Sequence, residues 1–240
     1  MNFFTKFFTK EKINIPADAP RFVQEYLHLF EKKEKNQGKK NILDCRFVVF
    51  DTEATGFYVE KDKMLSIGAL ELFGKKIEVE KSFELFIQQN DIVGNEAIDV
   101  HGILKKGKKI KITEQEAVEQ FISFCGDSIL VGHHVGFDIA LINKHLQHFY
   151  GVKMHNKSID TAFLAQRIAA MDNPYLMKRS EELSLDFLAK QYRIDTDDRH
   201  KALGDAYITA ILFLKLIQKI KGNKISLTLE DVLREKAFGI

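Results

Sequence analysis

Two carboxylates at the end of an apolar stretch are the first residues that could do chemistry. Asp51 and Glu53 follow the run CRFVVF, which predicts a buried strand at 45–50. Residues two apart on a strand point to the same face, so these like charges would repel each other unless a cation neutralised them. Carboxylate oxygens are the ligands that hard divalent cations prefer. The alternative is a turn that begins at Asp51 and leaves Glu53 in solvent.

Two further aspartates fall in the first turns of predicted helices. Asp138 opens the helix in GHHVGFDIALINKHL, directly after a short apolar strand, and Asp205 lies early in the helix in RHKALGDAYITAILFLKL. A carboxylate in the first helical turn is favoured by the helix dipole, so a capping role is a competing interpretation for Asp138.

A histidine precedes the second of these helices. His200 stands five residues before Asp205, about 140° away if both were helical, so the side chains converge only if His200 lies in the entering loop. Because histidine exchanges a proton near neutral pH, His200 beside an acidic metal site would suit a general base. The alternative is a surface histidine in a loop that contains Asp197, Asp198 and Arg199.

In this order the segments form a pattern that is more specific than any one of them. D-x-E, then G-H-x-x-x-F-D, then H-x-x-x-x-D-A resembles the DEDDh family of 3′-to-5′ exonucleases, to which the proofreading epsilon subunit of bacterial replicative polymerases belongs. The resemblance runs from about Phe47 to Leu216. It includes DTEATGF (51–57), VHGI (100–103), IDTAFLAQR (159–167) and LSLDFLAKQYRID (183–195).

This resemblance implies a ribonuclease H-like fold and a residue-by-residue site. Asp51, Glu53, Asp138 and Asp205 would hold two divalent cations, Mg²⁺ or Mn²⁺, and His200 would match the general base of the family. Two metal ions about 3.5–4 Å apart suit phosphodiester hydrolysis, because they can activate water on one side and stabilise the leaving oxygen on the other. Each cycle would release a nucleoside 5′-monophosphate from a 3′ end.

The resemblance also suggests residues that face the substrate: Thr52, Thr55, Gly56, Phe57, His101, Ile103 and His134. Phe57 matches an apolar family position that packs against the terminal base, although core packing is an equal alternative. The lysine-rich stretch 104–111 could follow a phosphate backbone or be a solvated loop.

Two positions depart from the family pattern. His134 stands where the family commonly has Asn, so it either supplies a similar donor or packs as a neutral residue. Ala54 stands where many members have Thr, and we expect this change to be tolerated because Thr55 and Gly56 remain.

The other titratable residues receive structural interpretations. Asp160 and Asp186 are expected to cap or flank helices. The histidines at 133, 134, 145 and 148 include no H-E-x-x-H pattern, which argues against a zinc hydrolase. Cys45 and Cys125 form no C-x-x-C pattern and are expected to be buried apolar residues.

Hydrophobic periodicity predicts the elements that position these residues. Strands are expected at 45–50, 64–73, 76–87 and 128–131, with a Gly74-Lys75 turn between the second and third. Helices are expected after the capping box at Thr113–Glu116, around 139–149, and at 161–170, 184–191, 202–219 and 229–236. The core-facing stripes of two of them are expected at Ile139, Ile142, Leu146 and Phe149, and at Leu203, Ala206, Ala210, Leu214 and Ile217. This order predicts an α/β fold, with a mixed central sheet that opens with an antiparallel meander and is flanked by helices.

The N-terminal region differs in charge from the rest. Residues 1–40 contain nine Lys/Arg and five Asp/Glu, a net +4, which leaves −2 for residues 41–240 of a chain with a net +2. Amphipathic stretches at 3–8 and 22–30 need a surface, for which the main domain is the first candidate. We expect a helical basic arm and linker at 1–40, an exonuclease domain at 41–220 and a packed helical tail at 221–240.

Composition excludes several classes of protein. With 240 residues, 45% hydrophobic and 29% charged, the chain is typical of neither a disordered nor a collagen-like protein. Its apolar runs are shorter than the roughly 20 residues of a membrane span, and the N-terminus does not resemble a secretory signal. We therefore expect a cytoplasmic protein with no membrane partner.

The expected activity is metal-dependent 3′-to-5′ exonucleolytic hydrolysis of single-stranded or frayed DNA ends. The nearest alternative is the same chemistry on RNA, as in members of the RNase T or oligoribonuclease type, because no motif senses the 2′-hydroxyl. A non-catalytic nucleic-acid-binding scaffold is less favoured, since all five family positions are intact. A DNA polymerase or another replication or repair protein could be a partner, and the oligomeric state is not predicted.

Overall fold

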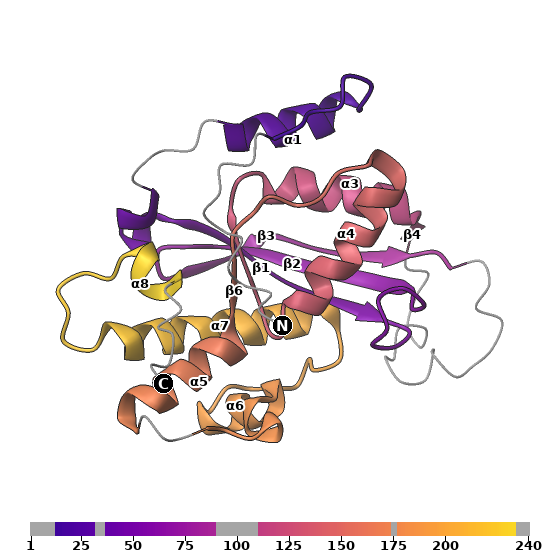
Figure 1. Ribbon diagram of the computed structural model, residues 1–240. Coiled ribbons are helices and arrows are strands. Elements are labelled where there is room, and N and C mark those ends of the chain that lie inside the picture. The colour runs from indigo at the N-terminus through magenta and orange to yellow at the C-terminus, as the bar shows by residue number, and fades with distance from the viewer. Residues whose placement is uncertain (1–12, 32–36, 90–109, 174–176, 234–240) are drawn as a thin grey trace.

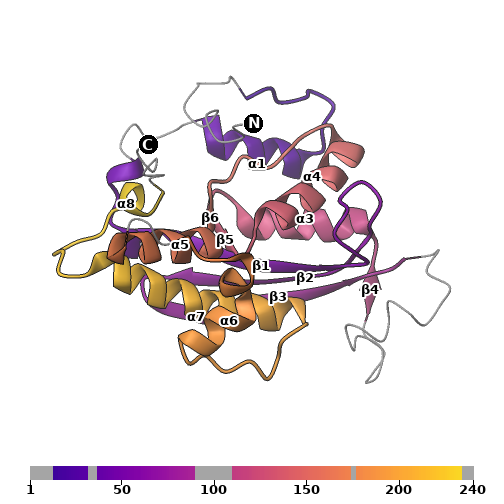
Figure 2. The same ribbon diagram turned by 60° about the horizontal axis from the view of Figure 1, so that its bottom comes forward.

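The computed structural model describes residues 13–31, 37–89, 110–173 and 177–233 (Figure 1). Within these ranges, one mixed sheet forms the centre of the molecule and helices cover both of its faces (Figures 1 and 2). The predicted α/β fold class is therefore confirmed. None of the described helices has the length and apolar character needed to cross a membrane.

The central sheet contains six strands in the described part of the chain. They are β1 (Arg46–Ala54), β2 (Met64–Phe73), β3 (Lys76–Ile87), β4 (Lys111–Ile112), β5 (Ile129–Gly132) and β6 (Ser158–Asp160), in the order β4-β3-β2-β1-β5-β6. β1, β2 and β3 are antiparallel neighbours, whereas β5 and β6 extend the sheet in parallel to β1. The predicted opening meander is confirmed.

β1 is longer than the periodicity predicted. It continues past residue 50 to Ala54, because β2 pairs with it along its whole length. Asp51 lies opposite Gly68 and Glu53 lies opposite Ser66, before the register shifts. The sheet therefore holds both carboxylates, and the alternative of a turn beginning at Asp51 is wrong.

The helices divide between the two faces of the sheet. One layer contains α1 (Arg21–Glu31), α3 (Glu114–Cys125) and α4 (Gly136–Tyr150); the other contains α5 (Thr161–Asp172), α6 (Leu185–Gln191), α7 (Ala202–Lys221) and α8 (Leu229–Leu233). Short 3₁₀ helices lie at Gln37–Lys39, Ile42–Asp44 and Ser180–Leu183. Since neighbouring residues of a strand point to opposite faces, Phe47 and Val49 join the α7 layer while Val48 and Phe50 join the α3 layer.

α1 packs on the α3 layer, as expected for the stretch 22–30. Val23 and Leu27 are fully buried, and the Tyr26 hydroxyl donates to Oδ1 of Asn156 at 2.6 Å. The backbone N–H of His155 donates to the same hydroxyl at 2.9 Å. The stretch 3–8 lies outside the described residues.

Most predicted helices are confirmed, with small shifts in their bounds and faces. The capping box at Thr113–Glu116 is present at the start of α3. In α4, Leu141 is fully buried while the predicted core residue Ile139 is only partly buried. In α7, Leu214 is likewise only partly buried, although it was placed in the core stripe. β4 and β6 were missed because two or three residues carry no periodicity.

Candidate active site

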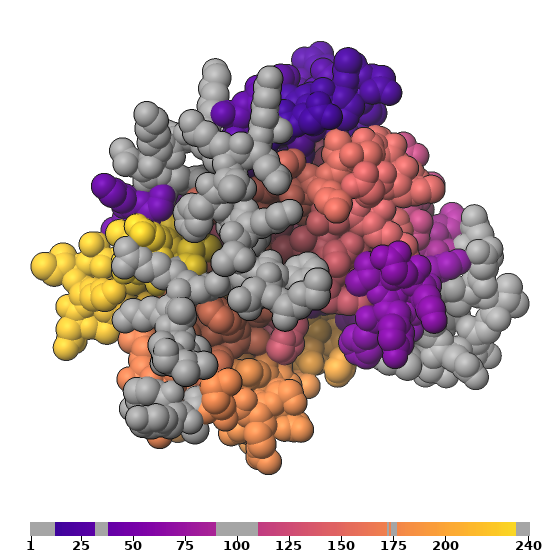
Figure 3. All heavy atoms as spheres, viewed as in Figure 1, coloured from indigo at the N-terminus to yellow at the C-terminus, as the bar shows by residue number. Residues whose placement is uncertain are grey.

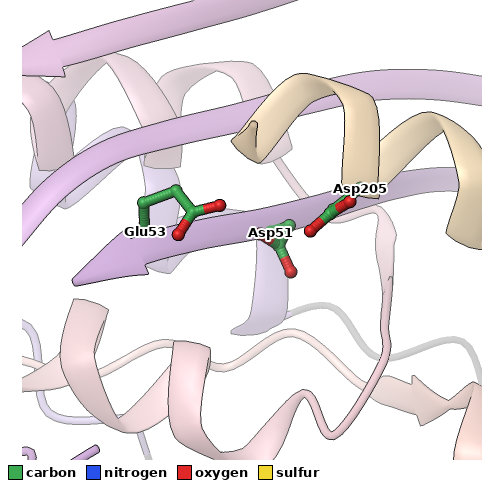
Figure 4. A group of neighbouring side chains, drawn as sticks. All are labelled: Asp51, Glu53 and Asp205. Carbon is green, nitrogen blue, oxygen red and sulfur yellow. The ribbon is translucent and has the colours of Figure 1, made fainter. Parts of the chain in front are cut away.

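Three carboxylates meet where β1 passes under the first turn of α7. Asp51 and Glu53 lie along one face of β1, and Asp205 comes down toward them from α7 (Figure 4). One carboxylate oxygen from each residue lies within 4.8 Å of the other two. Glu53 is 8% exposed and Asp205 is 6% exposed. Sequence positions 51 and 205 are thus brought into direct proximity.

A glycine in β2 makes this approach sterically feasible. A Cβ atom built on Gly68 would lie 2.0 Å from the backbone nitrogen of Leu203 and 2.2 Å from the carbonyl carbon of Ala202. Gly68 is also the residue that pairs with Asp51. Any side chain at this position would push α7 away from the sheet, and with it Asp205.

Asp138 approaches β1 from the opposite face. It is 4% exposed in the first turn of α4, and its Oδ1 accepts hydrogen bonds from the backbone N–H and the hydroxyl of Thr52, at 3.0 and 2.5 Å. It is outside the group of three whose oxygens meet, but its charge raises the pKa of Asp51. The N-cap residue of α4, Val135, makes no side-chain capping hydrogen bond, and the Asp138 carboxylate bonds across to β1.

The carboxyl groups disfavour one another's ionisation. Burial, followed by Asp138, Asp205 and Glu53, raises the pKa of Asp51 well above its usual range. Burial and Asp205 raise the pKa of Glu53 to about 7, and burial raises the pKa of Asp138 to about 7. Burial also raises the pKa of Asp205. Such a cluster is stabilised as carboxylates only when positive charge is brought close to it.

Arg199 supplies part of that positive charge. Its guanidinium bonds to Oδ2 of Asp205 and forms a forked pair with Asp186, with nitrogen–oxygen distances of 2.6 and 3.1 Å. The other oxygen of Asp205, Oδ1, is buried and has no hydrogen-bond partner among the described residues. A buried carboxylate oxygen without a partner, beside two more carboxylates, fits the donor set of a hard divalent cation.

His200 lies in the loop immediately before α7, as its predicted convergence with Asp205 requires. It is exposed and has a left-handed backbone with φ of 62°. Its charge lowers the pKa of both Glu53 and Asp205, so His200 interacts electrostatically with the acidic cluster. The loop is held against the helix start, since a Cβ on Gly204 would lie 2.0 Å from the backbone oxygen of Asp198.

The predicted substrate residues 52 to 57 have distinct environments. Thr52 is buried against Asp138. Thr55 donates its hydroxyl to Oδ1 of Asp62 at 2.9 Å, and a Cβ on Gly56 would meet Oδ2 of Asp62 at 2.7 Å. Phe57 is 90% exposed, which excludes the core-packing alternative, and its ring lies 6.2 Å from that of Phe137.

The remaining predicted substrate residues separate into two groups. His134 is exposed with φ of 55°, its backbone N–H donates to Oδ1 of Asp160 at 3.1 Å, and its ring packs edge-on against His133 at 4.6 Å. His101 and Ile103 lie outside the described residues, as does the lysine stretch up to residue 109.

Two predictions about other aspartates are resolved here. Asp160 caps α5 by accepting from the N–H of Ala162 at 2.9 Å, as expected. Asp186 flanks the start of α6 as expected, but it also anchors Arg199.

The pairing of Arg199 with Asp205 was not predicted, because it joins residues through a loop whose path no local pattern specifies. Gly68 was missed despite a signal, since an isolated glycine inside a predicted strand often marks a close backbone approach.

Comparisons with known proteins show which family the chain belongs to. The sequence profile of the family described as Exonuclease matches residues 48–213. The epsilon subunit of DNA polymerase III from Aquifex aeolicus (strain VF5) is 33% identical over 182 residues, which are 76% of this chain and 85% of that protein. A PolC-type DNA polymerase III from Clostridium perfringens (strain 13 / Type A) is 30% identical over 77% of this chain, but the match spans only 12% of that longer protein.

Two nucleases of known structure have a fold similar to that of this chain. E. coli exonuclease I in complex with a dT13 oligonucleotide matches with a TM-score of 0.59 and 15% identity, over 73% of this chain and 42% of that chain. Cell-death related nuclease 4 matches with a TM-score of 0.58 and 15% identity, over 73% of this chain and 64% of that chain. At these identities the structural similarity establishes the ribonuclease H-like fold alone.

The family profile covers more than half of the chain, and the epsilon subunit exceeds 30% identity over most of both sequences. The chain therefore belongs to the family of 3′-to-5′ exonucleases that includes the DNA polymerase III epsilon subunit.

Proposed function

We propose that this exonuclease removes nucleoside 5′-monophosphates from the 3′ end of single-stranded or frayed DNA, with two divalent cations, Mg²⁺ or Mn²⁺, as cofactors. The observation that carries the proposal is the meeting of carboxylate oxygens from Asp51, Glu53 and Asp205, in which Asp205 keeps one buried oxygen, Oδ1, without a hydrogen-bond partner among the described residues. Asp138 is proposed as the fourth ligand because it lies beside Asp51 on the other face of β1. Bound cations would polarise the attacking water and neutralise the charge that develops on the phosphate oxygens.

The protein groups around the cluster hold the carboxylates in place. Thr52 fixes Oδ1 of Asp138 through two hydrogen bonds, so this side chain cannot rotate freely when the cluster changes its charge. Arg199 fixes Oδ2 of Asp205 and leaves its buried Oδ1 without a hydrogen-bond partner among the described residues. Preorganised ligands need little rearrangement during the reaction, which is the main contribution a protein makes to this type of chemistry.

His200 is proposed as the general base that accepts a proton from the attacking water. The imidazole is exposed at the entrance to α7, where an incoming water can reach it, and its charge lowers the pKa of Glu53 and of Asp205. Its left-handed backbone is held by the close contact between Gly204 and Asp198, which limits where the ring can move.

Phe57 is proposed to stack on the terminal base. Its ring is 90% exposed beside Phe137, near the start of the loop that follows β1. That loop is held by Lys144, whose Nζ donates to the backbone oxygens of Val59 and Asp62 at 2.8 and 3.0 Å. An exposed aromatic ring on a fixed loop suits stacking, because every base presents a flat face.

The proposal is tested with 5′-labelled DNA and RNA of one sequence, in Mg²⁺, in Mn²⁺ and in EDTA. We expect a ladder that shortens from the 3′ end on DNA, no ladder in EDTA, and no ladder for Glu53→Gln. Faster cleavage of RNA would favour the exoribonuclease alternative, since nothing described in the site senses the 2′-hydroxyl. Hydrolysis that persists in EDTA would contradict the metal requirement.

The role of His200 has a separate readout. In His200→Gln the rate should fall by roughly 10²- to 10⁴-fold and lose its rise with pH through the neutral range, whereas binding of a dT oligonucleotide in Ca²⁺ should be retained. The matched control is His148→Gln, an exposed histidine on α4. A variant at position 200 with the normal pH profile would exclude the general-base role.

The relatives that match this chain are named as polymerase components. We propose that the chain acts with a DNA polymerase or another replication or repair protein, because the epsilon subunit and PolC-type proteins carry that name. Co-purification of the full chain with the polymerase encoded in the same genome tests this assignment.

A further inference from the structure

An apolar groove lies at the end of α7 that is remote from the carboxylates. It has a volume of about 620 Å³, and α7, the loop that follows it, the turn between β2 and β3, and the 3₁₀ helix at Ile42–Asp44 contribute its walls. Figure 1 shows the loop between α7 and α8 at the opposite end of α7 from the start of the helix. Asp205 and Lys221 are separated by sixteen residues of helix, or about 24 Å.

The floor of the groove is aliphatic. Ile211, Leu214 and Ile217 follow one another at helical spacing along α7, and Leu227 closes the end. Ile211 and Leu214 are only partly buried, which is why Leu214 departs from the predicted core stripe. α7 therefore carries a second apolar strip that the described part of the chain leaves open.

The rim is uniformly positive. Lys75, Lys215, Lys219 and Lys221 line the groove, and no Asp or Glu is among its lining residues. None of these four lysines forms an ion pair within the described ranges. Helix-dipole stabilisation accounts for the two lysines in the last turn of α7, but not for Lys75, which belongs to a different element.

Ile225 adds an exposed apolar residue to this rim. It lines the groove and is 99% exposed, the highest value among the large apolar side chains described. A molecule that covers both this isoleucine and the open aliphatic strip removes a large apolar area from water, which favours binding.

We propose that this lysine-rimmed groove docks a segment of a partner protein in which apolar residues alternate with Asp or Glu. Aliphatic residues of the segment would fill the strip along α7, and its carboxylates would pair with the lysines from α7 and the β2–β3 turn. The groove runs along α7 from Ile211, about 9 Å from Asp205, to Lys221, about 24 Å from it, and no residue of the carboxylate cluster lines it, so docking would leave the catalytic centre open.

A protein segment fits this surface better than a nucleic acid does. Bases stack on aromatic rings, but the floor is aliphatic, and the face of Tyr192 is already covered by Nζ of Lys219 at 5.1 Å from the ring centre. A phosphate backbone would use the lysines but leave the strip of Ile211 and Leu214 in water.

The test uses the full chain and a fluorescein-labelled synthetic peptide in which Leu residues alternate with Glu. We expect saturable binding by fluorescence polarisation, and a loss of at least about tenfold in Lys215→Glu/Lys219→Glu. The matched control is Lys153→Glu/Lys190→Glu, which reverses two exposed lysines that do not line the groove. Ile225→Ser should weaken binding by about three- to tenfold.

The position of the peptide is read from isoleucine methyl NMR signals. Those of Ile211, Ile217 and Ile225 should shift, and exonuclease activity of the groove variants should match that of the unaltered chain. The proposal fails if the groove and control variants bind the peptide equally, or if a peptide with Lys in place of Glu binds as well.

Three further outcomes would assign the groove to another occupant and overturn the proposal. The first is a dimer by light scattering that Ile225→Ser converts to a monomer, which would indicate a second copy of the chain. The second is loss of dT-oligonucleotide binding, with no peptide binding, in Lys215→Glu/Lys219→Glu. The third is peptide binding that occurs only after removal of residues 234–240, which would mean that the chain's own end fills the groove.

Discussion

The two ends of α7 carry opposite charges in opposite environments. At the start of the helix, Asp205 is 6% exposed and belongs to a cluster of carboxyl groups. At its end, Lys219 is exposed and Lys221 is partly exposed beside an aliphatic groove. Both arrangements suit the helix dipole, which stabilises each such charge by roughly 0.3–1 kcal/mol.

The difference lies in burial, and it separates a structural role from a chemical one. The dipole cannot offset the cost of burying several like charges, so the carboxylate end depends on Arg199 and on bound cations. The lysine end is stable by itself because water solvates it. The charge of a side chain at a helix terminus therefore does not indicate its role until the exposure of that side chain is known.

The sharpest test of this comparison is Asp51→Asn. We expect exonuclease activity to fall by at least about 10³-fold, because a ligand is lost. In EDTA the melting temperature should rise, since one source of repulsion is removed. Asp195→Asn, an exposed aspartate outside the cluster, should change neither quantity. An active Asp51→Asn protein would refute the proposed metal site.

Gly68→Ala should separate the two halves of the site without altering any charge. The added methyl group would displace the start of α7, so activity should fall by about 10²-fold and the free energy of unfolding by about 1–3 kcal/mol. Gly136→Ala is the matched control, since a Cβ there meets nothing within 4 Å. Normal activity in Gly68→Ala would show that α7 tolerates displacement.

Arg199→Gln should reveal how much free energy the burial of the carboxylates costs the metal-free protein. Removing the guanidinium leaves Asp205 without its charged partner, so the metal-free protein should lose about 1–3 kcal/mol of unfolding free energy. Saturating Mg²⁺ should recover most of the loss. Calorimetry in EDTA and in Mg²⁺ measures both, and equal losses in the two conditions would assign Arg199 a role unrelated to the cluster.

The stability of the metal-free protein should fall as the pH rises. Burial and neighbouring acids raise the pKa of Glu53 and of Asp138 to about 7, whereas carboxyl groups of unfolded chains titrate near 4. Between these values the folded state binds more protons, so the unfolding free energy decreases with rising pH. We expect the melting temperature in EDTA to drop by several degrees from pH 5 to pH 8. A flat profile in EDTA would contradict the raised pKa values.

The smallest effect is expected at the lysine end. Lys219→Gln/Lys221→Gln should cost no more than about 1 kcal/mol of unfolding free energy, through the helix dipole, and should leave the exonuclease rate unchanged. Urea denaturation at low and high salt measures this difference, which should shrink at high salt. A loss larger than that of Arg199→Gln would reverse the comparison between the two ends.

The sequence predicted the parts of the fold that follow a local pattern. The bounds of β2 and β3 follow from period-two apolar residues around Gly74, whose φ of 62° is the turn conformation that glycine readily adopts. The proximity of Asp51 and Glu53 followed from their spacing on a strand. The distance from Asp205 to these residues required the close packing of α7 on Gly68, which no periodicity encodes.

The roles of the site residues depend on similar long-range contacts. The pairing of Arg199 with both Asp186 and Asp205 depends on the path of a loop. The engagement of Thr52 with Asp138 depends on how the first turn of α4 packs against β1. A sequence motif can identify the residues of the site, but the tertiary structure determines which hydrogen bonds they form.

The packing of α1 has a practical consequence for where the chain can be cut. The family match begins at residue 48, yet Val23 and Leu27 of α1 are fully buried in the core cluster that contains α3. A fragment trimmed to the family boundary would expose that apolar surface to water and leave Asn156 without the Tyr26 hydroxyl. We therefore expect such a fragment to aggregate on expression, whereas one that begins at residue 13 should remain monodisperse.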